Sequence, residues 1–356
     1  MTRFAPLTAF AALALLVGCS GSSDPSDQGG AGAGAPATTG AGNGSTTGDM
    51  TGGTGGGGGA WDPGGPVTSY HAKMGPLPVA LGGEDTQCIT FRLDNPDTVY
   101  VRRFSTELLP GSHHMILYRS TETDENLTPT DCGGFSGLLE GDDPIFIAQQ
   151  AHTELELPTD EDGKPVALEL DAHQMVRVEL HYFNTTQTPL MVSGDIQLDT
   201  VPLSVAVTTS EIAFWGTENI QIDPLSSADT GVLFQRGIPN THAFAITTHE
   251  HHLGTEMRVW FGQGTQASST TALVDSHDWQ DPPLGLFSPP ISYGAAPDGE
   301  VLSTDGLAFE CNWQNPTTNT VSFGESINDE MCFLWQYYYP SQGFQACVDG
   351  ICGASF

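Results

Sequence analysis

Three short motifs gather histidines that could hold a metal ion. The chain contains 11 histidines, and the motifs read His113-His114-Met115, Leu180-His181-Tyr182 and His249-Glu250-His251-His252. Imidazole nitrogen is a common ligand of transition metals. The sequence therefore predicts metal binding, although each pair taken singly also fits solvated histidines on an exposed strand.

The spacing within each pair sets a requirement on the local backbone. Residues i and i+2 of a strand share a face, so His249 and His251 can point at one ion while His252 points away. Adjacent His113 and His114 would face opposite sides of a regular strand. Their joint use requires a bulge or a strand end, and the preceding Pro110-Gly111-Ser112 favours such a break.

The elements that carry these motifs are expected to be strands. Helical periodicity is scarce, whereas short β-rich runs bounded by Gly, Pro, Asn and Asp recur. We expect an all-β fold of two antiparallel, jelly-roll-like β-sandwich domains, residues 64–205 and 206–356. The expected strands are 88–93, 98–104, 114–118, 175–183, 190–198, 243–248, 257–261, 307–313 and 333–339.

The first 63 residues indicate export rather than folding. One positive charge at Arg3 precedes an apolar run from Phe4 to Val17, which is typical of a signal peptide over residues 1–18. Cys19 resembles a bacterial lipobox cysteine and would be lipidated. Residues 19–63 are dominated by Gly, Ser, Thr and Ala and are expected to be a disordered linker. We expect a lipid-anchored protein of the bacterial cell envelope, with the outer membrane favoured, whose lipid anchor is its only membrane contact.

Charge and cysteine content narrow the class further. Acidic residues outnumber basic residues 43 to 10, so the surface repels phosphate and nucleic-acid binding is not expected. Six cysteines remain besides Cys19, an even number that favours disulfides in an exported protein. Fifteen pairings are possible. Their grouping along the chain suggests Cys88–Cys132, Cys311–Cys332 and Cys347–Cys352, but spacing does not decide between the alternatives.

A fourth motif, Asp329-Glu330-Met331-Cys332, is followed by Tyr337-Tyr338-Tyr339-Pro340. In this order, the four motifs resemble those of the copper type II, ascorbate-dependent monooxygenases, which include the peptidylglycine-hydroxylating and dopamine-hydroxylating enzymes. The resemblance covers about residues 85–340.

The resemblance implies two coppers per chain. His113, His114 and His181 would hold one, and His249, His251 and Met331 the other, which is the catalytic site. A thioether is a soft ligand that favours Cu(I). Ascorbate or a similar small reductant would supply electrons, and one atom of dioxygen would enter a C–H bond of a small-molecule substrate while the other leaves as water.

The chain departs from the family at the substrate clamp. Peptide-hydroxylating members hold a carboxylate with an arginine, an asparagine and a tyrosine, whereas the matching positions here read Thr247, Phe333 and Trp335. We therefore expect these residues to bind an apolar or aromatic substrate. Glu179 replaces a family glutamine, which leaves electron delivery open.

The alternative is a non-enzymatic, copper-handling lipoprotein on the same scaffold. His252 is expected to be structural or to support a ligand. The remaining histidines match no ligand position and are expected to form ordinary hydrogen bonds; they are His71, His152, His173, His242 and His277.

Overall fold

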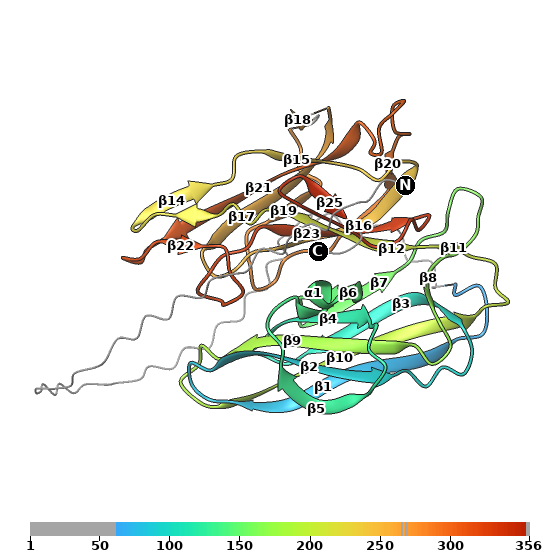
Figure 1. Cartoon of the computed structure of the whole chain (residues 1–356), viewed down its shortest axis with the longest axis horizontal. Helices are drawn as coiled ribbons and strands as arrows, with labels where there is room; N and C mark the ends of the chain where they lie inside the picture. Colours follow the sequence, from blue (N-terminus) through green and yellow to red (C-terminus); the bar gives the residue numbers. More distant parts are fainter. Residues whose placement is uncertain (1–61, 265, 268–269, 354–356) are drawn as a thin grey trace, which may run out of the picture. The chain divides into compact units, whose positions relative to one another are not determined.

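The computed structural model describes residues 62–264, 266–267 and 270–353. The predicted signal peptide, Cys19 and nearly all of the predicted linker lie outside the described residues. The prediction of an all-β fold is confirmed, because strands dominate and the described part of the chain contains one short helix, α1 (Ser136–Glu140) (Figure 1). Within that part, no helix is long and apolar enough to cross a membrane.

The first half of the folded chain forms two sheets, coloured blue to green in Figure 1. The β1 sheet runs in the order β1 (Thr68–Val79), β10 (Leu190–Pro202), β3 (Val99–Leu108), β8 (Val166–Leu170) and β11 (Thr208–Thr209), with β7 (His152–Glu156) also on β3. The β9 sheet runs in the order β5 (Asn126–Asp131), β2 (Glu84–Arg92), β9 (Met175–Phe183), β4 (Ser112–Arg119) and β6 (Asp143–Ala148).

The second half forms two more six-stranded sheets and one small pair. The β23 sheet runs in the order β20 (Gly285–Tyr293), β16 (Thr241–His249), β23 (Phe333–Tyr339), β12 (Glu211–Gly216), β24 (Gln345–Val348) and β25 (Ile351–Gly353). The β21 sheet contains β14 (Ser226–Asp229), β21 (Asp305–Asn315), β17 (Gly254–Gln263) and β18 (Gln266–Ala267), with β15 (Leu233–Arg236) on β21 and β19 (Val274–Ser276) on β17. The small pair is β13 (Gln221–Ile222) with β22 (Val321–Ser322).

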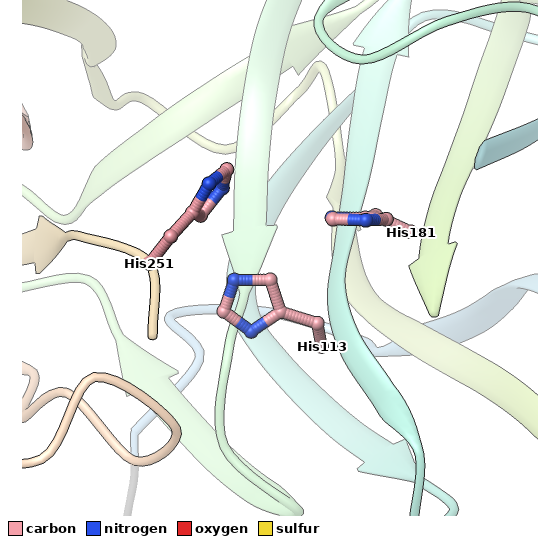
Figure 2. A group of neighbouring side chains, drawn as sticks. All are labelled: His113, His181 and His251. Atoms are coloured by element: carbon pink, nitrogen blue, oxygen red, sulfur yellow. The ribbon is translucent and has the colours of Figure 1, made fainter. Parts of the chain in front are cut away.

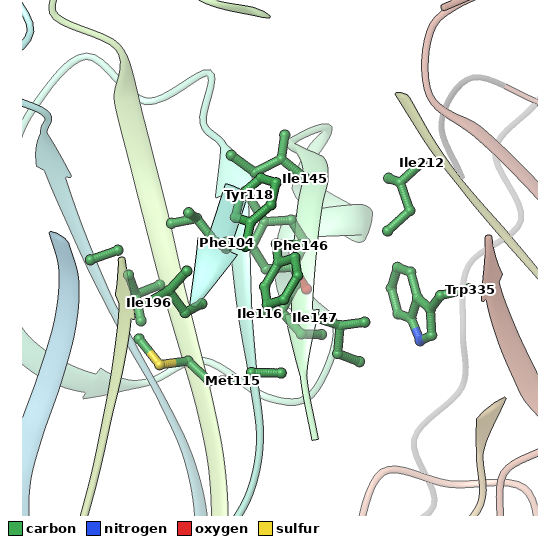
Figure 3. Close-up of a cluster of buried hydrophobic side chains, with 14 of the residues drawn as sticks. Phe104, Met115, Ile116, Tyr118, Ile145, Phe146, Ile147, Ile196, Ile212 and Trp335 are labelled. Carbon is green, nitrogen blue, oxygen red and sulfur yellow. The ribbon is translucent and has the colours of Figure 1, made fainter. Parts of the chain in front are cut away.

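Sheets with two buried faces bring the halves together. Every residue of β9 and of β23 is buried. β23 accordingly reads as a nearly continuous apolar run, whereas β9 also buries the polar side chains of Arg177, Glu179 and His181. One face of the β23 sheet packs on the β21 sheet. Its other face joins the first half in a single hydrophobic core, and Figure 3 shows Ile147 of β6 on the side of the strand that faces Ile212 and Trp335.

All three suggested disulfides are confirmed: Cys88–Cys132, Cys311–Cys332 and Cys347–Cys352. Cys88–Cys132 links β2 to the end of β5, and Cys347–Cys352 closes the β24–β25 hairpin. Cys311–Cys332 links β21 to the residue that follows Met331. The division into domains near residue 205 remains a prediction: β10 ends at Pro202, and β11 still pairs with β8 of the first half.

Candidate metal centre

His113 lies at a β-bulge, as its neighbour His114 requires. Ser112 pairs with Tyr182 and His114 with His181, so His113 is the extra residue in β4. Gly111 precedes it with a φ of +94°, a conformation that side chains rarely adopt. The bulge turns both imidazoles to one side, and their ring centres lie 5.2 Å apart. Because His181 on β9 pairs with His114 on β4, its ring lies beside theirs, 5.2 Å from the ring of His114 and 5.4 Å from that of His113.

His249 and His251 come together in a different way from the expected one. β16 ends at His249, so His251 lies in the following turn rather than on a continuing strand. In the turn, the carboxylate of Glu330 accepts the backbone N–H of His251 at 3.1 Å and that of Leu253 at 2.6 Å. These two bonds take the place of the hydrogen bonds that a neighbouring strand would otherwise provide. The two rings still lie 5.3 Å apart.

The histidines of the two halves form one cluster. The ring of His249 lies 5.2 Å from that of His113 and 5.2 Å from that of His114. The ring of His251 lies 5.7 Å from that of His113 and 6.1 Å from that of His181. The structure thus assembles five of the six predicted ligands at one place; their division between two ions remains a prediction.

The cluster has the properties that a metal site requires. Four buried imidazole nitrogens have no hydrogen-bond partner, and they are Nε2 of His113, Nδ1 of His114, Nε2 of His249 and Nε2 of His251. Burial lowers the pKa of His113, His114 and His249 well below the usual value, and the pKa of His251 falls to about 3. The rings are therefore neutral, with lone pairs free for copper, and the residues present fit that ion.

Hydrogen bonds on the other ring nitrogens fix the orientation of three ligands. His249 Nδ1 lies 2.6 Å from Gln149 Oε1, and His251 Nδ1 lies 3.2 Å from the carbonyl oxygen of Asp329. His181 Nε2 lies 3.1 Å from the carboxylate of Glu84. Each acceptor holds the N–H of its ring, which leaves the opposite nitrogen for a metal.

Met331 is buried, and the neighbouring carboxylate organises its surroundings. Glu330 accepts hydrogen bonds from Trp313 Nε1 at 3.0 Å and from the backbone N–H of Met331 at 3.3 Å, besides those of the turn. Burial raises the pKa of Glu330 to about 7 although these donors oppose the shift. This residue therefore connects the Met331 segment to the turn that carries His251.

An apolar cavity of about 200 Å³ lies beside Met331. It is lined by Gly134, Phe135, Leu138, Leu139, Phe214, Glu218, Phe323, Glu325, Met331, Phe333 and Val348. No lysine or arginine is among these described lining residues. Gly216 leaves room for Phe333, because a Cβ there would lie 2.0 Å from that ring.

Of the three predicted substrate residues, Phe333 alone is among the described residues that line this cavity. Trp335 is fully buried behind the wall, with its ring 4.4 Å from that of Phe214, and its Nε1 has no partner. The hydroxyl of Thr247 instead accepts a hydrogen bond from Gln149 Nε2 at 3.1 Å.

Two arginines of the second half, Arg236 and Arg258, are engaged in other contacts and do not line this cavity. Arg236 donates to the carbonyl oxygens of Leu302 and Ser303 and pairs with Glu300. Arg258 pairs with Glu256 and Glu310 and lies over Trp260.

The remaining histidines make ordinary contacts. His71 pairs with Asp195, His152 with Glu107, and His277 with Asp275. His242 bonds Ser292 and stacks on Tyr339, and His252 Nδ1 bonds the carbonyl of Ile327. His173 adopts a positive φ of 52° in a turn.

Sequence reasoning missed three residues that shape the centre. Gln149 and Glu84 orient ligands, and Phe135 stacks on His114 while also touching His249 and Trp335. Each acts on a partner distant in the chain and sits in no recognisable motif. Only Gly133-Gly134 before Phe135 hints at an unusual backbone.

Comparisons with known proteins indicate the same family as the motifs. Residues 216–353 match the family described as copper type II ascorbate-dependent monooxygenase, C-terminal domain. A human protein called putative DBH-like monooxygenase protein 2 is 23% identical over 300 residues, which cover 74% of this chain and 58% of the relative. The chain thus spans little more than half the length of that relative. These matches confirm the resemblance that the motifs indicated.

Likeness to solved structures is weak. A triple jelly-roll protein of an archaeal virus covers 76% of this chain and 56% of its own, at 8% identity and a TM-score of 0.19. A capsid protein of infectious bursal virus covers 77% and 68%, at 9% identity and a TM-score of 0.14. Scores this low do not establish a shared fold.

Proposed function

We propose, from the match of residues 216–353 to the copper type II ascorbate-dependent monooxygenase C-terminal domain, that this chain hydroxylates a C–H bond of an apolar or aromatic small molecule. The observation that carries the proposal is the cluster of buried, neutral imidazoles with unpartnered nitrogens. His113, His114 and His181 would hold one copper, and His249, His251 and Met331 the other.

Copper, when bound, supplies the one-electron chemistry with dioxygen that amino-acid side chains lack. The residues of the chain hold and shield the centre. Gln149, Glu84 and the Asp329 carbonyl keep ring protons on the nitrogens that face away from the metal. Phe135 and Trp279 cover the cluster, since their rings lie 5.5 Å from His114 and 5.4 Å from His113. Water exclusion of this kind limits side reactions.

The substrate class follows from the cavity beside Met331. Phe135, Phe214, Phe323 and Phe333 offer aromatic faces, and a carboxylate taken out of water needs a cation that this lining does not provide. Behind Phe214, the buried Trp335 has an Nε1 donor without a partner. We assign a neutral apolar or aromatic substrate to this cavity.

A second cavity, of about 320 Å³, offers a route for the reductant. His113 and Gln149 line it, together with polar and apolar residues that include Ser112, Thr186 and Gln280. A small reductant of the ascorbate type can approach His113 from this side while substrate occupies the cavity at Met331. We place the enzyme at the bacterial cell envelope, most simply the outer membrane, held by lipid on Cys19.

Oxygen consumption by the copper-loaded chain tests the proposal. Uptake should require ascorbate and should increase with aromatic or apolar candidates, with mass spectrometry finding products heavier by one oxygen atom. A glycine-extended peptide should not be turned over, and efficient turnover of that peptide would contradict the assigned substrate class. Copper binding without substrate-dependent uptake across a broad panel would favour the copper-handling alternative.

A further inference from the structure

Phe135 contacts both the histidine cluster and the cavity beside Met331. Figure 2 shows three imidazoles of the cluster around a common space: His113, His181 and His251. The ring of Phe135 lies against the other two, stacked on His114 at 5.5 Å and edge-on to His249 at 5.7 Å. The same side chain lines the cavity. Its position therefore decides how far a bound molecule can reach toward these ligands.

The backbone of Phe135 adopts an unusual conformation. Its φ of +52° lies in the left-handed region, which bulky residues rarely adopt. A conformation of this kind persists only where the surrounding contacts impose it. One such contact comes from the second half, where Glu325 Oε2 accepts the backbone N–H of the preceding Gly134 at 2.9 Å. Neighbouring side chains, rather than local backbone preference, thus fix the Phe135 ring.

A buried carboxylate provides the second contact. Glu179 on β9 is fully buried, and its Oε1 accepts the backbone N–H of Phe135 at 2.7 Å. Its Oε2 accepts the hydroxyls of Tyr118 at 3.2 Å and of Ser136 at 3.4 Å. A carboxylate is buried at low cost only where such donors replace water. Because two of these three donors belong to residues 135–136, Glu179 ties this segment to β9.

The cavity has room for one aromatic ring. Its volume is about 200 Å³, and an apolar cavity of about 150 Å³ is large enough to bind benzene. The ring of Phe135 lies 5.8 Å from that of Phe214 and 6.4 Å from that of Phe333, both of which also line the cavity. Movement or loss of the Phe135 ring would therefore change the space available to a substrate.

We propose that Phe135 limits the substrate cavity to a single aromatic ring, and that Glu179 is the positioning residue that holds Phe135 in place. The inference rests on the proposed function, which makes the cavity beside Met331 the substrate site. It assigns Glu179 to the shape of that site rather than to electron delivery.

Binding of benzene and naphthalene tests the size limit. Calorimetric titration of the copper-loaded full chain without reductant measures both affinities in the absence of turnover. The wild-type chain should prefer benzene. Phe135→Ala should shift the ratio of the two affinities toward naphthalene by at least about tenfold, since one methylene in an apolar pocket already changes discrimination by about 10–200-fold.

The matched control is Phe244→Ala. Phe244 is buried and packs on Tyr337 and Tyr339, but it is not among the described residues that line the cavity. Its loss should leave the ratio of affinities unchanged. Should Phe135→Ala not fold, Phe135→Leu takes its place, because it removes the ring and keeps an apolar side chain.

A double-variant cycle tests the positioning role. Glu179→Leu cannot accept the Phe135 N–H, so it should relax the size preference in the otherwise wild-type chain. It should add little to Phe135→Ala, because Glu179 acts through a ring that is then absent. Glu179→Gln keeps an acceptor oxygen and should retain the wild-type preference. Glu179→Met replaces the leucine variant if that variant does not fold.

Glu211→Leu is the control for loss of a buried carboxylate. Glu211 is buried and pairs with Arg119, and it is not among the described lining residues of the cavity. This variant should lower stability without changing the size preference.

An unchanged ratio of affinities in Phe135→Ala, or no binding of either probe by the wild-type chain, would overturn the size limit. Equal effects of Glu179→Leu with and without the Phe135 ring would overturn the positioning role. Oxygen consumption separates these failures from that of the proposed function. A chain whose size preference shifts as expected but which hydroxylates nothing disproves only the enzymatic proposal. An active enzyme whose size preference does not respond to Phe135 disproves only the size limit.

Discussion

At the residue scale, one amide links the two halves at a predicted copper ligand. Gln149 Nε2 donates to the carbonyl of Thr248 at 2.9 Å, which fixes the amide orientation and turns Oε1 toward His249 Nδ1. His249 therefore presents Nε2 to the metal. The same amide excludes water from this side of the ring, because it is buried.

Replacing Gln149 by leucine should lower copper affinity at the His249 site by about 10–100-fold, since the ring loses the acceptor that fixes its tautomer. Gln149→Glu, which keeps an acceptor, should retain more of the affinity. Chelator competition measures both, and Gln150→Leu is the control because Gln150 bonds the exposed Asp281 instead. Equal affinities for the leucine and glutamate variants would contradict this role.

The buried histidines also predict how copper binding responds to pH. Protons compete with a metal only below the pKa of the ligand, and burial places the pKa values of His113, His114 and His249 well below 6.5 and that of His251 at about 3. Copper affinity should therefore change little from about pH 7.5 to 5. A steep loss beginning near pH 6.5 would show that these rings titrate like exposed histidines.

At the element scale, the turn after β16 depends on a carboxylate distant in the sequence. Glu330 accepts from His251, Leu253, Trp313 and Met331 inside the protein. Glu330→Ala leaves four buried donors without this acceptor, and each such donor costs about 1–3 kcal/mol. Urea unfolding of the copper-free protein should show a loss of about 3 kcal/mol or more. Exposed Glu325→Ala should cost far less.

The three disulfides should contribute in the order of their loop lengths. The linked cysteines are 44, 21 and 5 residues apart for Cys88–Cys132, Cys311–Cys332 and Cys347–Cys352. Loop-closure entropy gives about 4, 3 and 2 kcal/mol respectively. Denaturation of the three paired Cys→Ala variants checks this order. Loss of the Cys311–Cys332 bond should also weaken copper binding at Met331, and the hairpin variant should not.

At the scale of the whole molecule, the common core should make the two halves unfold together. Ile147 of β6 and Trp335 of β23 belong to the same buried cluster. Ile147→Ala should cost about 2–5 kcal/mol, and hydrogen exchange should accelerate in β21 of the second half as well as in β8 of the first. Acceleration confined to the first half would show that the halves unfold separately.

The sequence by itself determined the strands and the residues capable of chemistry. The strands expected at 175–183 and 333–339 occur with those bounds. Residues 175–183 alternate apolar with polar side chains and residues 333–339 are a short, mostly aromatic run, and both patterns favour a strand. Adjacent His113 and His114 required a bulge, since pleating otherwise separates neighbours, and the Pro-Gly before them supplied it. The grouping of cysteines also indicated the right disulfides.

Tertiary structure decided where those residues meet. From strand alternation alone, His251 was expected to share a face of one strand with His249. In the structure β16 ends at His249, and Glu330 accepts the backbone N–H of His251 in the turn that follows. The partnership of Gln149 with His249 spans 100 residues and that of Glu84 with His181 spans 97. Such contacts depend on how sheets pack, and packing is a property of the whole set of buried surfaces rather than of any local pattern. The histidine cluster therefore exists because the two halves bury a common core.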